Sequence, residues 1–569
     1  MTESPVVKET KAQRVERLKR EKNPWECLAE IRRFAQEGYE SIPPEWLGTY
    51  FRWWGVYTQG DGAGAVGGKG GEGKAVPYFM VRIRIPNGIL RARQLRTIAG
   101  LAARYARGVV DITVRQNIQL HWVTIEALPE LLAGLWQAGL TTMGACGDGT
   151  RNITGCPLAG VDRDEAVDAS PLVQAATWAL NGNAAFYNLP RKYKICITGC
   201  RVWCSYPEIN DVGLTAITRE RGGRSEVGFS LRVGGGLSTD PHLGDRLDAF
   251  VRWEQVVPVV RGITELFRES EVLRENRERA RLKFLFLRHG WTDERFQKEL
   301  ELRLGFPLDP AAPEDPPEDI YRDHVGIHPQ RQEGISYAGI AVLRGRLTAE
   351  QMVRVADLAD RYGTGELRTT GMQNLLILNV PGHHLDSLNR GVEDTGLHLT
   401  ASPFWRGTVA CTGTEFCKLA ITETKGYARW LVEDLEARLP GFAHHLKIHI
   451  TGCPNSCGQH WIADLGLEGK KVTVDGRMVD AYYFCVGGGV GKHQATARPV
   501  GYRCPAAEVP EAIERLLMGY LADREEGENF RQFCARHSDE DLRALLAGRV
   551  VGATSRDASP GRPPHGVDG

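Results

Sequence analysis

The feature that most constrains the fold is an internal duplication. Residues 194–214 (KICITGCRVWCSYPEINDVGL) align without a gap with residues 447–467 (KIHITGCPNSCGQHWIADLGL), and 11 of the 21 positions are identical. Upstream, RQNIQL at 115–120 matches MQNLLI at 372–377 in the same order. Two long copies exclude a solenoid, which needs more and shorter units. We therefore predict an α/β (α+β) fold whose halves are related by a pseudo-twofold axis, with ligands bound between them.

Composition and residue patterns divide the chain into five segments. Residues 1–75 predict charged helices followed by a Gly-rich loop, and residues 76–250 form the first repeat. Residues 251–335 predict helices and a Pro-rich linker, residues 336–550 form the second repeat, and residues 551–569 predict a disordered tail. Within the first repeat, YFMVRIRIP and VVDITVRQNIQLHWV are interpreted as strands, and ARQLRTIAGLAARYA and LPELLAGLWQAGL as amphipathic helices.

The Gly-rich loop contains Gly62, Gly64 and Gly67 in the spacing G-x-G-x-x-G. A dinucleotide site of that type lies between a strand and a helix. Because no strand pattern precedes these glycines and no amphipathic helix pattern follows them, we interpret the stretch as a flexible surface loop.

The charge balance narrows the classes of partner. The 569 residues include 71 basic and 71 acidic side chains, which argues against nucleic acid or an anionic membrane as the main partner. No run approaches 18 apolar residues, and the N-terminus lacks the apolar core of a signal peptide, so we expect a cytoplasmic protein. The 13 cysteines are then expected to be metal ligands or buried thiols rather than disulfides.

The second copy carries four thiols in two pairs. Cys411 and Cys417 are spaced Cys-x5-Cys, and Cys453 and Cys457 are spaced Cys-x3-Cys. Four thiolates can hold a [4Fe–4S] cluster. A structural zinc site is the alternative, but a five-residue spacing is looser than zinc sites usually show.

The first copy lacks such a set. Cys200 and Cys204 are retained and Cys156 aligns with Cys411, but Asp162 stands where the fourth thiol would be. We interpret Cys200 and Cys204 as remnants of the duplication. A second cluster here would have to recruit a further thiol from Cys146, Cys156 and Cys196.

The first copy is distinguished instead by cations at alternate positions. Arg82 and Arg84 share one face of a predicted strand, and Lys192 and Lys194 share another. In VRQNIQLHW, one face of the predicted strand carries Arg115, Asn117, Gln119 and His121. Cations on several strands of one domain suit a buried polyanion rich in carboxylates together with a small anionic substrate.

At these segments the sequence resembles a known family. CTGTEFC followed by TGCPNSCGQ is similar to the cluster signature of the ferredoxin-dependent nitrite and sulfite reductases. RIRIPNG, RQNIQLHW, RNITGCPLAG, NLPRKYK and VGGGLS resemble further segments of that family, in the family's order, from about residue 48 to residue 535.

The resemblance implies two cofactors. One is siroheme, an iron tetrapyrrole with eight carboxylates, and the other is a [4Fe–4S] cluster joined to it through the shared thiolate of Cys457. The cluster ligands would be Cys411, Cys417, Cys453 and Cys457. The cations that bind the substrate would be Arg82, Arg151, Lys192 and Lys194, and the side chains that line the siroheme would be Arg115, Gln119 and His121.

The reaction implied by the resemblance is the six-electron reduction of nitrite to ammonia or of sulfite to sulfide. The chain has no flavin or nicotinamide segment, so we expect ferredoxin or flavodoxin as electron donor to a monomeric enzyme. Arginines would hold the anion, and a desolvated lysine of lowered pKa would donate protons. An alternative is a non-catalytic electron-transfer protein that carries siroheme and the cluster, although retention of all four cations argues against it.

The motifs disagree on which anion is the substrate. NLPRK, GCPLAG, CTGTEFC and TGCPNSCGQ are more similar to the nitrite branch of the family. Lys194 is more similar to the sulfite branch, since plant-type nitrite reductases tend to carry Asn at this place. We expect nitrite as the preferred anion, with assimilatory sulfite reduction as the alternative and measurable turnover of both.

Overall fold

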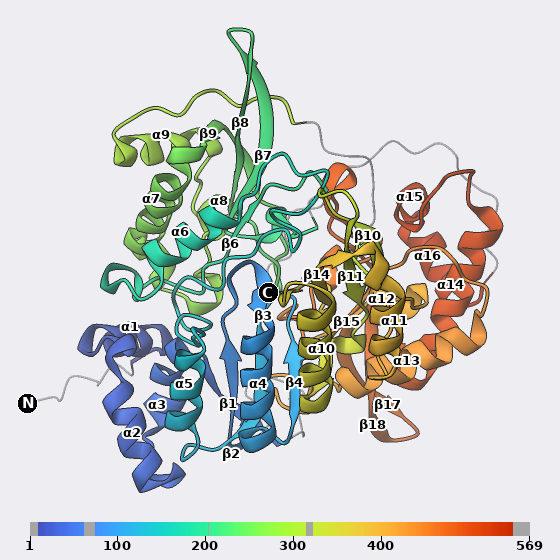
Figure 1. Ribbon diagram of the computed structural model, residues 1–569, viewed down its shortest axis with the longest axis horizontal. Helices are drawn as coiled ribbons and strands as arrows, with labels where there is room; N and C mark the ends of the chain where they lie inside the picture. The colour runs from blue at the N-terminus through green and yellow to red at the C-terminus, as the bar shows by residue number, and fades with distance from the viewer. Residues whose placement is uncertain (1–8, 62–73, 203, 315–321, 550–569) are drawn as a thin grey trace, which may run out of the picture.

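The computed structural model describes residues 9–61, 74–202, 204–314 and 322–549. The Gly-rich loop, the end of the Pro-rich linker and the C-terminal tail predicted above lie outside these residues. Four sheets and the helices that cover them make up the described chain (Figure 1).

Two five-stranded sheets are formed by strands of both halves. The first has the order β1 (Val56–Gly60), β2 (Ala75–Ile83), β5 (Ile118–Val123), β4 (Val109–Ile112), β12 (Arg346–Thr348). The second has the order β10 (Gly326–Pro329), β11 (Ile335–Ile340), β14 (Leu375–Pro381), β13 (Glu366–Thr369), β3 (Ile89–Arg91).

The other two sheets belong to one half each. The first-half sheet has the order β6 (Ile195–Thr198), β7 (Val212–Arg221), β8 (Arg224–Val233), β9 (Asp245–Arg252). The second-half sheet has the order β15 (Thr408–Ala410), β16 (Ile448–Thr451), β17 (Leu465–Val474), β18 (Arg477–Val486), β19 (Arg498–Pro505).

Helices cover the sheets and form the N- and C-terminal ends of the described chain. Those of the first half are α1 (Lys11–Glu21), α2 (Leu28–Glu37), α3 (Pro44–Gly48), α4 (Ala92–Tyr105), α5 (Leu128–Gln137), α6 (Ser170–Leu180), α7 (Val256–Glu269), α8 (Phe284–Arg288) and α9 (Asp293–Leu304). Those of the second half are α10 (Ala349–Tyr362), α11 (Leu385–Glu393), α12 (Pro403–Gly407), α13 (Lys425–Arg438), α14 (Val509–Asp523), α15 (Phe530–Arg536) and α16 (Asp539–Leu546). Among the described helices, none has the length and apolar character needed to span a bilayer.

The two halves exchange a strand with each other. β3 of the first half pairs with β13, and β12 of the second half pairs with β4. The exchange is matched by reciprocal hydrogen bonds: Gln116 donates to the carbonyl of Thr369 at 3.1 Å, and Gln373 donates to the carbonyl of Ile112 at 2.9 Å. These paired contacts establish the pseudo-twofold relation that the sequence predicted.

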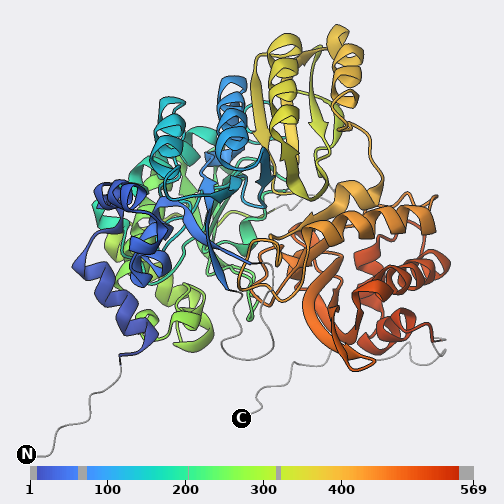
Figure 2. The same ribbon diagram turned by 90° about the horizontal axis from the view of Figure 1, so that it is seen from below.

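Helices α4 and α10 lie side by side where the halves meet (Figures 1 and 2). Arg96 of α4 forms ion pairs with Asp357 and Asp360 of α10, both at 2.7 Å. Beneath them, one continuous hydrophobic core takes side chains from both halves, including Ile98 and Val355. Burial of this shared apolar surface fixes the relative position of the halves.

Most predicted elements of the first repeat are present, but one strand prediction is wrong. Helix α4 lies within ARQLRTIAGLAARYA, and α5 lies within LPELLAGLWQAGL. Strand β2 begins before YFMVRIRIP and ends within it, at Ile83. VVDITVRQNIQLHWV is two antiparallel strands, β4 and β5, joined by a turn at residues 113–117 in which Gln116 has a φ of 59°. Arg115 and Asn117 therefore lie in the turn and do not share a strand face with Gln119 and His121.

Candidate active site

The four thiols of the second half meet at one edge of a sheet. β15 and β16 are parallel, so their carboxyl ends lie together, and Cys411 directly follows β15 while Cys453 lies just beyond β16. The backbone N–H of Gly452 donates to the sulfur of Cys411 at 3.2 Å, and the side-chain amide of Asn455 donates to the sulfur of Cys453 at 3.4 Å. Such N–H···S contacts stabilise thiolate ligands.

Cys457 differs from the other three thiols in being exposed. Its charge acts on Cys411, Cys417 and Cys453, so all four groups are close. Burial, followed by the charge of Cys457, raises the pKa of Cys417 to about 12. Thiols that resist ionisation alone are suited to binding metal, whose charge stabilises the thiolate form.

The loop between Cys411 and Cys417 is clamped to the first half. Phe416 stacks on His121 of β5, with ring centroids 3.7 Å apart, and its carbonyl accepts a hydrogen bond from the Gly60 N–H at 2.8 Å. His121 is fully buried, and its Nε2 lies 3.1 Å from the carboxylate of Asp111. The loop between Cys411 and Cys417 thus covers one face of the His121 ring.

The predicted substrate cations come together opposite these thiols. Arg82 is held by Gln119 at 2.6 Å and by the Cys146 sulfur at 3.2 Å, which fixes its guanidinium. Arg151 donates to the carbonyl of Gly147 at 3.0 Å. The charge of Cys457 acts on Arg82 and on Lys192, so the exposed thiol lies near these first-half cations.

The two lysines flank Tyr193, which is fully buried, just before β6. Burial, followed by the charge of Arg281, lowers the pKa of Lys192 to about 7. Burial, followed by the charge of Arg115, holds the pKa of Lys194 well below its usual range. A lysine whose pKa is near neutrality can donate a proton at physiological pH and recover it from solvent.

Arg281 is a site residue that sequence reasoning missed. It donates to Asp211 at 3.0 and 2.8 Å, and Asp211 in turn accepts from the backbone N–H of Lys194 at 2.8 Å. Asp211 carries a sequence signal, because Asp464 occupies the same place in the second copy and accepts from the N–H of Lys447 at 2.7 Å. Arg281 carries none, since it lies in the charged region between the repeats.

Buried cations in the first half lack acceptors for part of their hydrogen-bonding capacity. Burial lowers the pKa of Arg84 and of Arg115 to about 10. Among the described residues, no acceptor serves the buried Nε groups of Arg84, Arg115 and Arg151. Buried donors of this kind fit a ligand that brings carboxylates, because an unpaired buried charge is unfavourable.

The structure thus brings together the four thiols and the cations Arg82, Arg151, Lys192 and Lys194. Arg115 reaches the same region from the turn after β4, donating to Asn210 at 2.8 Å and to the Asn152 carbonyl at 2.6 Å. Gln119 contacts Arg82, and His121 contacts the loop between Cys411 and Cys417.

Two family models match most of the chain. The nitrite and sulphite reductase 4Fe–4S domain matches residues 146–308 and 402–550, and the nitrite/sulfite reductase ferredoxin-like half domain matches residues 72–138 and 328–394. The chain belongs to the nitrite and sulfite reductase family. It is therefore an oxidoreductase whose cofactors are siroheme and a [4Fe–4S] cluster, and the thiols and buried cations described above fit both groups.

Relatives within this reductase family include both branches. The chain is 41% identical to the assimilatory ferredoxin-dependent nitrite reductase of Haloferax mediterranei, over 89% of this chain and 88% of that one. It is 37% identical to sulfite reductase [ferredoxin] 2 of Mycolicibacterium paratuberculosis, over 90% and 92%. The structure of the Mycobacterium tuberculosis NirA protein matches with a TM-score of 0.88 at 35% identity, over 93% of this chain and 97% of that one.

Proposed function

We propose that this reductase converts nitrite to ammonia with six electrons from ferredoxin, according to NO2⁻ + 6 e⁻ + 8 H⁺ → NH4⁺ + 2 H2O. The observation that carries the proposal is the cation set opposite Cys457, in which burial brings the pKa of Lys192 to about 7. The preference for nitrite is supported by the nitrite-like motifs and by the 41% identical relative, which is a nitrite reductase.

The cofactor ligands follow from the same arrangement. We propose that Cys411, Cys417, Cys453 and Cys457 hold the [4Fe–4S] cluster and that Cys457 is shared with the siroheme iron. When bound, these groups supply single electrons and an iron site that accepts the anion. Arg115 and the unpaired Nε groups near it would hold siroheme carboxylates by charge-assisted hydrogen bonds.

The substrate is held and protonated by the chain's own residues. Arg82 presents a guanidinium whose orientation is fixed by Gln119 and Cys146, so it can bind anion oxygens without losing side-chain freedom on binding. Arg151 adds a second permanent charge. Lys192 and Lys194, whose pKa values are lowered by burial, donate the protons that release each oxygen as water.

Sulfite is the second candidate substrate, and Lys194 favours it. Sulfite carries up to two charges on three oxygens, whereas nitrite carries one charge on two, so a fourth cation benefits sulfite more. The test is kcat/KM for each anion with the same reduced ferredoxin. We expect the value for nitrite to be the higher, and a value for sulfite ten times higher would overturn the assignment.

A further inference from the structure

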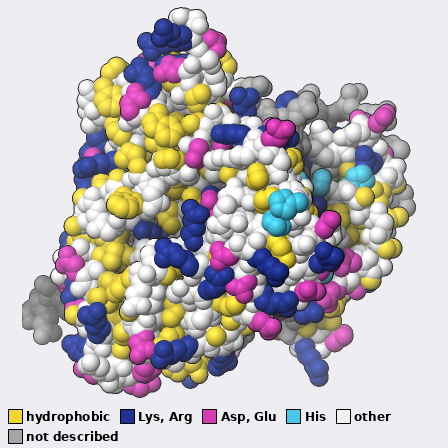
Figure 3. Space-filling model, viewed as in Figure 1, with side chains coloured by type: hydrophobic (Ala, Val, Ile, Leu, Met, Phe, Trp, Pro, Cys, Tyr) yellow, Lys and Arg dark blue, Asp and Glu magenta, His cyan; other side chains and the backbone are white. Residues whose placement is uncertain are grey.

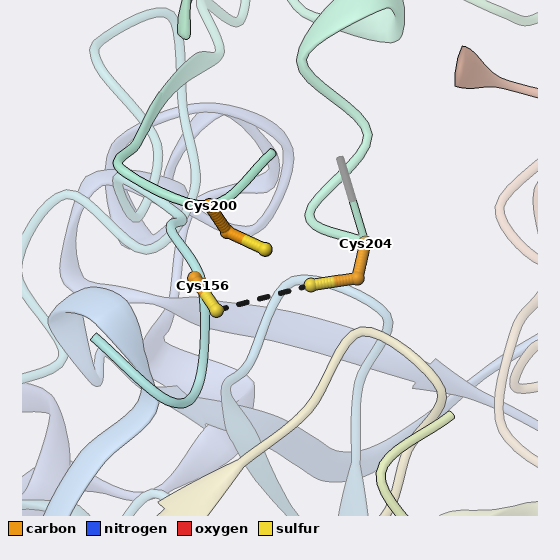
Figure 4. Close-up of side chains that lie close together, drawn as sticks. All are labelled: Cys156, Cys200 and Cys204. Carbon is orange, nitrogen blue, oxygen red and sulfur yellow. Dashed lines mark hydrogen bonds between the residues drawn. The ribbon is translucent and has the colours of Figure 1, made fainter. Parts of the chain in front are cut away.

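Three thiols that the cluster does not use converge in the first half. The sulfur atoms of Cys156, Cys200 and Cys204 all lie within 4.8 Å of one another, and those of Cys156 and Cys204 are 4.0 Å apart (Figure 4). Cys156 and Cys200 are buried, and Cys204 is half-buried. Their sulfur atoms point toward a common centre.

The fold brings these thiols together as it brings the cluster thiols together. Cys200 lies two residues after β6, as Cys453 does after β16, and Cys156 follows Thr154, which forms a parallel bridge with Cys196 of β6. The position of the fourth thiol is taken by Asp162, which is bound to Arg322 at 2.8 Å. This side chain is therefore not available to hold the fourth iron of a cluster.

The spacing of the sulfurs distinguishes a single ion from a cluster. Zinc with thiolates at about 2.3 Å in a tetrahedron places its sulfurs about 3.8 Å apart. A cluster has several irons between its ligands, which holds the thiolates further apart. The sulfurs of Cys156, Cys200 and Cys204 match the spacing around a single zinc ion. The four thiols assigned to the cluster all lie within the described residues, and no three of their sulfurs lie within 4.8 Å of one another.

The surroundings of the three thiols also suit a metal. The N–H of Val202 donates to the Cys200 sulfur at 3.3 Å, and the N–H of Leu158 donates to the Cys156 sulfur at 3.4 Å. His324 lines the same small cavity as Cys204, is only 3% exposed, and has no hydrogen-bond partner for either ring nitrogen among the described residues. Imidazole is the nitrogen ligand of Cys3His zinc sites. The ring nitrogens of His324 lie outside the 4.8 Å group of the three sulfurs, so its side chain would have to move closer to complete such a site.

We propose that Cys156, Cys200 and Cys204 bind one zinc ion, a structural metal site distinct from the [4Fe–4S] cluster. These thiols pack against Tyr337, Leu376 and Leu378 of the second half. The ion would join the segment after β6 to the loop that carries Cys156, at the point where both contact the other half. This role is independent of the reaction proposed above, because it involves neither the substrate cations nor Cys457.

The first test is to measure the metal content of holoenzyme purified from cells that were grown with zinc in the medium. We expect about one zinc ion per chain in addition to the cluster and siroheme iron. The double variant Cys200→Ser/Cys204→Ser should lose the zinc and keep its iron. Cys196→Ser is the matched control, because Cys196 is a buried neighbour that donates to Ser205 at 3.3 Å and is outside the set; it should keep both metals.

A second measurement does not depend on the variants folding. X-ray absorption at the zinc edge of the wild-type enzyme should show three sulfur ligands at about 2.3 Å. Fewer than three sulfurs, the absence of zinc, additional iron bound by this set, or a Cys156–Cys204 disulfide found by mass spectrometry without reduction would each overturn the proposal.

Discussion

The two halves share a duplicated architecture but carry different side chains at matching positions. Arg82 faces Gln119 across β2 and β5, whereas Gly339 faces Leu376 across β11 and β14. A Cβ at Gly339 would lie 1.6 Å from the carbonyl oxygen of His324, so no side chain fits there. The backbone at His324, which leads into the second repeat, occupies the space that the Arg82 side chain occupies in the first repeat.

The same contrast holds around the second-half counterpart of the cation site. A cavity of about 300 Å³ there is lined by Cys204, Met372, His445 and Lys447. In the alignment of the two copies, these residues are equivalent, in the same order, to Cys457, Arg115, Lys192 and Lys194. The first half thus carries the cations that we propose bind the anion, and the second half carries the thiols that we propose hold the cluster. On this assignment neither half alone holds a complete reductase site, so the chemistry depends on the interface between them.

The largest effect is expected from removing the thiol that faces the cations. Because a hydroxyl is a poor ligand for these irons, Cys457→Ser should lower turnover by more than about 100-fold, beyond the loss typical of residues around a metal site. Iron, acid-labile sulfide and activity with a reduced dye are the measurements. Cys204→Ser, its counterpart, should keep its iron and most activity; loss of four irons there would contradict the difference between the halves.

Lys192 tests whether the cations of the first half act on the substrate. Lys192→Met keeps the length of the side chain but removes its proton, so we expect kcat to fall by about 100-fold or more with siroheme still bound. The matched variant His445→Gln, at the second-half position, should change kcat little. If Lys192→Met loses siroheme instead, the residue anchors the cofactor.

The pH profile gives a second readout for the same group. If the ammonium form of Lys192 donates the proton, as we propose, kcat should fall as the pH rises through about 7, the pKa to which burial lowers this group. Lys192→Arg keeps the charge at higher pH but cannot release a proton readily, so this limb should disappear and leave a low, flat rate. An unchanged limb in Lys192→Arg would assign the titration to another group.

Lys194 sharpens the comparison of substrates. Loss of one charge-assisted contact corresponds to about 1.5–3 kcal/mol, which is about 10- to 100-fold. Lys194→Asn should therefore lower kcat/KM for sulfite by at least about tenfold and for nitrite by a smaller factor. Equal losses for both anions would show that Lys194 has no part in selecting between them.

The smallest effect is expected where the halves are clamped together. Phe416→Leu removes the stack on His121, which is worth about 1 kcal/mol, so iron should leave to a chelator about fivefold faster while the initial turnover stays near that of the wild type. Phe404→Leu, which removes a stack on Phe442 with centroids 5.1 Å apart and lies entirely within the second half, is the control. An equal release rate in both variants would show that the clamp does not protect the cluster.

The sequence by itself determined the duplication and the helices of the first repeat, and it predicted the four cluster thiols. These signals are local: a repeated frame, a period of apolar residues, and a fixed spacing of ligands. It failed at VVDITVRQNIQLHWV because the β-rich composition conceals the turn, in which Gln116 takes a positive φ and bonds to Thr369 in the other half. A contact 253 residues away is not visible in a pattern of neighbours.

Only the tertiary structure decided the rest. It added Arg281, engaged His121 with the cluster loop, and gathered Cys156 with Cys200 and Cys204, which the sequence suggested were only remnants of the duplication. It also set the pKa of Lys192, since desolvation depends on every atom packed around the side chain. Spacing along a chain fixes which ligands are available, whereas distances between sulfurs and the burial of charges exist only after the halves have packed together.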